Sequence, residues 1–203
     1  FAKGVEYTVL ISIVSTFFGV IIGVVLALMR FSKQKWLRGL AISYTEFIRG
    51  TPLMVQVLFV YFGIGVVVNI PALISGMIAV SLNSGAYVAE IIRGGINSVA
   101  KGQTEAAASL GLSKGDLMRF VILPQAFKNI WPALGNEFIS LIKESSIVSI
   151  IGVTDLIYQL NIVRADTYRG VMPIFVAMLL YFIMTFALTR VLNHFEGKMK
   201  HAG

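Results

Sequence analysis

The sequence contains no cysteine and few charged residues. Without cysteine, the chain can form no disulfide, offers no thiolate nucleophile and binds no metal through sulfur. Only 13% of its 203 residues are charged, whereas soluble domains typically have roughly 25%. Hydrophobic residues make up 57% of the chain. This composition argues against a soluble monomer.

The charged residues are missing from long blocks rather than thinned evenly along the chain. Residues 8–29, 50–89 and 170–189 contain none. A helix crosses a bilayer core about 30 Å thick with roughly 20 residues, so the first and last blocks each fit one crossing and the middle block fits two. The turn signal Asn69-Ile70-Pro71 divides the middle block between its two crossings.

A less apolar segment after residue 126 raises the predicted number of membrane crossings to five. The predicted fold class is therefore all-α, a polytopic membrane protein with one transmembrane domain over residues 1–203. The predicted crossings are 8–29, 51–68, 72–93, 127–151 and 171–192.

The distribution of lysine and arginine predicts the orientation in the membrane. Short cytoplasmic loops carry an excess of these residues. Segments 30–50 and 100–128 are basic, segment 66–71 has no charged residue, and segment 152–170 has two basic residues matched by two acids. We therefore expect the N-terminus outside and the C-terminus in the cytoplasm. The same bias explains the net charge of +7, so no nucleic-acid partner is expected.

A polar loop at residues 101–124 follows the third crossing and contains signals for two short helices. Residues 105–110 favour a helix, and Gly111 stands where a left-handed residue would end it. Ser113 is a candidate N-cap for a second helix, which Pro124 is expected to stop. The plain interpretation of this loop is a folded connector between two crossings.

The loop also resembles a known motif, the EAA loop in the permease subunits of ABC importers. The resemblance rests on Glu105-Ala106-Ala107, on Gly111 and on Ile122-x-Pro124. It extends over essentially the whole chain to the polar amino-acid uptake branch. The further motifs are Arg49-Gly-Thr-Pro-Leu53 with Gln56, Ala86-Tyr-Val-Ala-Glu-Ile-Ile-Arg-Gly94, and Lys143-Glu-Ser-Ser146 leading to Ile151-Gly152. This chain has Glu144-Ser145 where family permeases usually carry an Asp-Thr pair.

The resemblance implies a type I ABC importer permease fold in the bacterial inner membrane. It also implies three partners: ATP-binding cassette ATPase subunits, a second permease copy in a homodimer or heterodimer, and an extracytoplasmic amino-acid-binding protein. The loop would hold the coupling helix, with Glu105 and Arg119 pairing with charges on the ATPase. The coupling residues implied in this way are Glu105, Ala106, Ala107, Gly111, Arg119 and Pro124.

The chain lacks the phosphate-binding motif GxxxxGK[ST]. We therefore expect ATP to be bound by a partner ATPase, and this chain to need no cofactor and to catalyse no reaction. Its two isolated histidines do not predict a metal site.

Polar side chains within the predicted crossings mark a candidate substrate path, because ionisable groups are costly inside a membrane. Glu137, Ser140 and Glu144 share one side of the fourth crossing. A carboxylate in an aqueous cavity would attract an ammonium group, and two carboxylates favour a basic amino acid such as arginine, lysine or histidine. The predicted substrate-binding residues are Glu144, Asn83, Tyr87, Gln56, Ser140, Glu137 and Ser84.

Structural interpretations of these residues stay open. Glu144 could form a salt bridge between helices, Asn83 and Ser84 could bond a neighbouring helix, and Glu90 could pair with Arg93. Two other functions also stay open. An ion-coupled secondary amino-acid carrier would need an internal repeat, for which the sequence gives no convincing sign. A membrane scaffold would leave the polar side of the fourth crossing unexplained.

Overall fold

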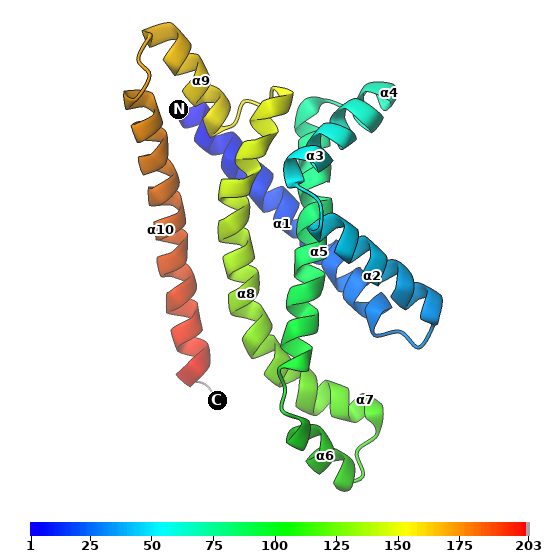
Figure 1. Ribbon diagram of the computed structural model, residues 1–203. Coiled ribbons are helices and arrows are strands. Elements are labelled where there is room, and N and C mark those ends of the chain that lie inside the picture. The colour runs from blue at the N-terminus through cyan, green and yellow to red at the C-terminus, as the bar shows by residue number, and fades with distance from the viewer. Residues whose placement is uncertain (202–203) are drawn as a thin grey trace.

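The computed structural model describes the backbone of residues 1–201 and the side chains of residues 1–198 (Figure 1). Every regular element in this part of the chain is helical, which confirms the all-α prediction. The last two residues of the predicted domain, 202 and 203, lie outside the described part.

The α-helices are α1 (Ala2–Arg30), α2 (Lys35–Arg49), α3 (Leu53–Leu58), α4 (Val66–Val68), α5 (Ala72–Asn97), α6 (Lys101–Ser109), α7 (Lys114–Asp116), α8 (Leu123–Glu144), α9 (Leu156–Thr167) and α10 (Met172–His201). Two π-helical segments, η1 (Phe59–Gly65) and η2 (Leu117–Ile122), and the 3₁₀-helical η3 (Ser145–Ile151) lie between them.

Three unbroken helices, α1, α5 and α10, are long and apolar enough to cross a membrane. Two further candidate spans are bent. One joins α2 to Leu53–Val68 at an angle of 105°, and the other joins Lys114–Ile151 to α9 at 56°. If each bent pair is one span, the total is five, as the sequence predicts. The N-terminus, α4 and α9 lie at one end of the molecule, whereas α6 and α7 lie at the other (Figure 1).

Helices α1 and α5 cross in close contact because glycines leave no side chain between them. A Cβ atom on Gly19 would lie 2.8 Å from the Oγ of Ser84, and one on Gly23 would lie 2.4 Å from a side-chain carbon of Val88. Small residues spaced four apart permit this approach between membrane helices. The crossing forms the centre against which the other helices pack.

We expect Gly23→Ala to destabilise the protein by about 1–3 kcal/mol, because the added methyl group overpacks the α1–α5 contact. Gly39→Ala is a matched control, since a Cβ atom there has no neighbour within 4 Å. An alanine within a helix interior is favoured over glycine by roughly 0.5–1 kcal/mol, so the control should keep or raise the melting temperature. Thermal unfolding of the purified protein measures both changes. Identical melting temperatures for the two variants would contradict the close α1–α5 packing.

The prediction of a basic loop over residues 30–50 was wrong, because most of this segment is helical. Residues Lys35–Arg49 form α2 instead, with Ala41, Thr45 and Ile48 buried. Ala41 belongs to a cluster with residues of α1 and α5. The basic side chains at and near the start of α2 are exposed. They interrupt the hydrophobic run without interrupting the helix, which is why the sequence suggested a loop.

Pro124 does not end a helix, which corrects a second expectation. The chain stays helical from Lys114 through η2 and α8 to Ile151. A proline within a helix lacks an N–H donor and crowds the carbonyl four residues earlier. The π-helical segment η2 ends two residues before Pro124, and such local adjustments accommodate prolines in membrane helices. The predicted short helix and the predicted fourth crossing are therefore one continuous element.

The segment 152–170, expected to be a loop, contains α9. The carboxylate of Asp155 caps this helix, and its Oδ1 accepts a hydrogen bond from the N–H of Tyr158 at 2.9 Å. The hydroxyl of Thr8 on α1 accepts another from the N–H of Leu156 at 3.2 Å. The contact with α1 that holds α9 in place joins residues far apart in the sequence, so no local pattern indicates it.

Candidate functional site

A cavity of about 400 Å³ lies where the start of α3 meets α5 and the junction of α8 with η3. This volume is within the range of roughly 300–1,000 Å³ found for small-ligand sites. Three of the predicted substrate-binding residues, Asn83, Tyr87 and Glu144, line it together. The complete lining is Thr51, Pro52, Leu53, Met54, Asn83, Tyr87, Glu144, Ser146 and Ile147.

Glu144 is the acidic residue of this lining. It is the last residue of α8, at the point where the α-helix changes to the 3₁₀-helical η3. Its side chain is exposed, and no basic side chain among residues 1–198 forms an ion pair with it. The interhelical salt bridge considered for Glu144 is therefore absent from the described part of the chain.

Asn83 is buried beside the cavity and is held by Gln56. The Nδ2 of Asn83 donates a hydrogen bond to the Oε1 of Gln56 at 3.0 Å. The Nε2 of Gln56 in turn donates to the carbonyl of Ile48 at 2.7 Å and to the Oγ1 of Thr51 at 2.9 Å. Gln56 does not line the cavity itself. Its side chain ties the bend between α2 and α3 to α5, and so it positions Asn83.

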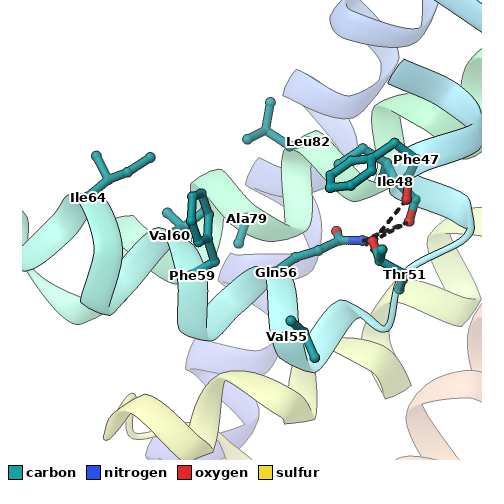
Figure 2. Close-up of a pocket in the computed structure, with 10 residues that line it drawn as sticks. All are labelled: Phe47, Ile48, Thr51, Val55, Gln56, Phe59, Val60, Ile64, Ala79 and Leu82. Atoms are coloured by element: carbon teal, nitrogen blue, oxygen red, sulfur yellow. Dashed lines mark hydrogen bonds between the residues drawn. The ribbon is translucent and has the colours of Figure 1, made fainter. Parts of the chain in front are cut away.

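A second cavity of about 310 Å³ lies on the other side of Gln56, between α2, α3 with η1, and α5. Figure 2 shows the amide of Gln56 pointing to Thr51 and Ile48 at one end of this cavity, with apolar side chains around the rest. None of its lining residues is titratable. The first cavity is therefore better suited to a charged or zwitterionic ligand.

Ser84, Glu137 and Ser140 do not line the cavity, although the sequence grouped them with Glu144. The Oγ of Ser84 donates a hydrogen bond to the Oε1 of Glu137 at 3.2 Å, which joins α5 to α8. Glu137 lies two helical turns before Glu144, about 10 Å away along the helix axis. Ser84 thus forms a hydrogen bond with a neighbouring helix, which is one of the alternatives that the sequence left open.

Three arginines surround Glu90 next to the cavity. The Nη2 of Arg93 lies 2.7 Å from the Oε2 of Glu90, which is the pairing considered from the sequence. Arg30 also pairs with Glu90, and the Nη1 of Arg49 lies 3.5 Å from its Oε2. The guanidinium of Arg49 stacks on Tyr87, with its Cζ 5.3 Å from the ring centroid. Sequence reasoning missed Arg30 and Arg49 because they come from α1 and α2, although Arg49 stands in a motif noted above.

The polar loop contains two helices joined by a glycine, as the sequence predicts. Gly111 has φ of +80°, and the N–H groups of Gly111 and Leu112 donate to the carbonyls of Ala108 and Ala107. These two bonds form a Schellman motif at the end of α6. The Oγ of Ser113 accepts from the N–H of Asp116 at 3.2 Å and caps α7.

The residues assigned to coupling lie at different places in this loop. Glu105, Ala106, Gly111 and Arg119 are exposed, whereas Ala107 is buried. Pro124 is exposed near the start of α8 rather than in the loop. Leu110, between the two helices, is 81% exposed. The loop thus presents an apolar tip with charged residues on either side. Among the described residues there is no group of three or more side chains suited to a metal ion.

Comparisons with known proteins identify similar chains. The sequence model described as "Binding-protein-dependent transport system inner membrane component" matches residues 19–201. The putative glutamine transport system permease protein GlnP of Rickettsia felis is 41% identical over 97% of this chain and 91% of its own length. The arginine transport system permease protein ArtQ of Bacillus subtilis is 42% identical over 98% of this chain and 91% of its own.

Solved structures show the same fold. A chain in a crystal structure of an amino acid ABC transporter with histidines has a TM-score of 0.94 and 47% identity, over 97% of this chain and 92% of that one. An inward-facing MetNI methionine ABC transporter has a TM-score of 0.80 over 97% of this chain and 94% of that one. Its identity is 17%, so this second likeness concerns the fold alone.

Proposed function

Because this chain is an amino-acid ABC importer permease of the family of binding-protein-dependent transport system inner membrane components, we propose that it conducts basic amino acids. The proposed path runs through the cavity of about 400 Å³ that Glu144 lines, which we call the Glu144 cavity. The observation that carries the proposal is the exposed carboxylate of Glu144, which has no partner among the described side chains and lines a cavity with Asn83 and Tyr87. A cationic substrate side chain would supply an opposite charge for this carboxylate, which a neutral amino acid such as glutamine could not do with its side chain. The names of two similar proteins, one an arginine permease and one a transporter with histidines, agree with this substrate class, whereas a third is named a putative glutamine permease.

The proposed orientation places the N-terminus and α9 outside and the α6–α7 end in the cytoplasm. Exposed lysines and arginines at positions 33–38, around the start of α2, and in the polar loop support it, because cytoplasmic segments are enriched in these residues. The extracytoplasmic binding protein would then deliver its amino acid at the end where α4 and α9 lie.

The loop from α6 to α7 is the proposed contact with the ATPase subunits. The glycine cap and the Ser113 cap give the loop a defined shape, and the exposed Leu110 offers an apolar side chain to a partner. The second half of the loop continues without interruption into α8, which ends at Glu144. A displacement of the loop by the ATPase would therefore reach the substrate cavity along one helix and rock the span between inward-open and outward-open states.

A second permease copy is the proposed partner within the membrane. In α10, only 11% of the apolar span is buried within this chain, against 61% in α5. One copy therefore leaves much apolar surface for lipid and a neighbouring subunit to cover. The rival function, an ion-coupled secondary carrier, predicts that no ATPase subunit co-purifies with the chain.

The test of the substrate proposal is Glu144→Gln. We expect the affinity for arginine to fall about 10-fold or more, because a charge-assisted hydrogen bond contributes about 1.5–3 kcal/mol, whereas the affinity for glutamine should change much less. Isothermal titration of the purified permease–ATPase complex, without the binding protein, measures both. Glu137→Gln is the matched control, since Glu137 does not line the cavity. Equal losses for arginine and glutamine in Glu144→Gln would assign Glu144 a structural role.

A further inference from the structure

The three arginines around Glu90 carry more positive charge than their surroundings neutralise. Among the side chains of residues 1–198, Glu90 is the one carboxylate that pairs with Arg30, Arg49 and Arg93. The side chains of Glu90 and Arg30 are only 15% and 20% exposed, whereas those of Arg93 and Arg49 reach the surface of the helix bundle. Charge inside a membrane protein is normally paired, and an excess of this kind marks a place where an anion is stabilised.

Arg49 is the arginine of this cluster that is best placed to bind a further anion. Its distance to Glu90 is 3.5 Å, against 2.7 Å for Arg93, and its side chain is 43% exposed. Its guanidinium stacks on Tyr87, which lines the same cavity as Glu144. Thr51, two residues after Arg49, lines that cavity as well. Arg49 is therefore loosely held by its carboxylate and lies beside the proposed substrate site.

We propose that Arg49 binds the α-carboxylate of the amino acid in transit, while Glu144 binds its cationic end. This inference rests on the proposed function, because it uses the same cavity. The planar guanidinium matches a carboxylate with two parallel hydrogen bonds, which a lysine cannot reproduce. The substrate carboxylate would share Arg49 with Glu90 and reduce the excess positive charge of the cluster.

This arrangement makes the free carboxylate part of what the permease recognises. A basic amino acid would present its α-carboxylate to Arg49 and its cationic side chain to Glu144. A decarboxylated amine of the same length satisfies Glu144 but leaves Arg49 with its excess charge. The permease should therefore discriminate against such amines even when the binding protein is absent.

The experiment compares arginine with agmatine, which is arginine without its carboxylate. Isothermal titration of the permease–ATPase complex without binding protein gives the affinity for each. We expect the wild type to prefer arginine about 10-fold or more, the size of effect given by one charge-assisted hydrogen bond. Arg49→Gln should remove most of this preference by weakening arginine alone, and Arg49→Lys should restore part of it. Arg38→Gln is the matched control: Arg38 is an exposed arginine of the same helix that belongs neither to the cluster nor to the cavity, so its replacement should keep the preference.

The possible results separate this inference from the proposed function. Equal affinity of the wild type for arginine and agmatine overturns the role of Arg49 alone. Equal weakening of both ligands by Arg49→Gln assigns Arg49 a structural role and also overturns it. Binding of neither ligand by the wild type counts against the Glu144 cavity as the amino-acid site. If Arg49→Gln does not assemble with the ATPase, the same two ligands are compared in Arg49→Lys. We expect this variant to prefer arginine over agmatine less strongly than the wild type does. An unchanged preference would overturn the inference.

Discussion

Glu90→Gln is expected to destabilise the permease by about 3–5 kcal/mol, the cost of removing one partner from a buried ion pair. Glu90 is 15% exposed and pairs with arginines from α1, α2 and α5. Glutamine keeps the shape of the side chain but leaves three guanidinium groups without a counter-charge. Arg49 and Arg93 are partly exposed, so solvent screening places the effect towards the lower value. The melting temperature and the yield of folded protein measure it.

The control for this substitution is Glu46→Gln. Glu46 lies on α2, is exposed and has no ion pair among the described side chains. Its replacement should change the melting temperature little, since isolated surface charges contribute little to stability. If both variants melt at the wild-type temperature, the ion-pair cluster does not hold α1, α2 and α5 together.

Gly111→Val is expected to abolish most amino-acid-stimulated ATP hydrolysis without unfolding the membrane helices. The φ of Gly111 is +80°, a conformation that costs other residues roughly 1–2 kcal/mol and β-branched residues more. Valine would therefore open the turn between α6 and α7 and change the surface offered to the ATPase. A Cβ atom at this position has no neighbour within 4 Å, so the expected loss arises from the backbone and not from crowding within the chain.

Gly111→Asn is the matched variant at the same position, because asparagine tolerates the left-handed conformation. It should retain most of the stimulated hydrolysis when the permease is reconstituted with its ATPase and binding protein. Wild-type hydrolysis by the valine variant would contradict the role of this turn. Equal loss in both variants would mean that any side chain at residue 111 obstructs the partner.

The parts of the fold that the sequence predicted well depend on local signals. The first, third and fifth spans are continuous hydrophobic runs, and α1, α5 and α10 cover them. The end of α6 at a left-handed glycine and the start of α7 at a capping serine are equally local. In each case the cause lies within a few residues of its effect.

The parts that were missed depend on contacts between distant segments. Helix α2 was hidden because its charged residues looked like a loop, whereas its buried side packs against α1 and α5. Pro124 was expected to stop a helix because the π-helical turn before it leaves no clear mark in the sequence. Similarly, α9 depends in part on a hydrogen bond from Leu156 to Thr8, two residues that lie 148 positions apart in the sequence.

The candidate site shows the same division. Helical spacing correctly placed Asn83 and Tyr87 on one side of α5, and both line the cavity with Glu144. Spacing also grouped Glu137 with Glu144, but the structure places Glu137 against Ser84. Arg49 could not be assigned to the site by spacing, since only the bend between α2 and α3 brings it to Tyr87.

The light packing of α10 bears on how the protein is made. Synthesis proceeds from the N-terminus, so α1, α5 and α8 leave the ribosome before α10 does. The glycine contacts between α1 and α5 and the arginine cluster around Glu90 involve none of the last 30 residues. The nascent chain can therefore form the α1–α5 crossing and the arginine cluster before the final helix enters the bilayer. Helix α10 then docks onto a finished surface, where Leu192 covers Gly135.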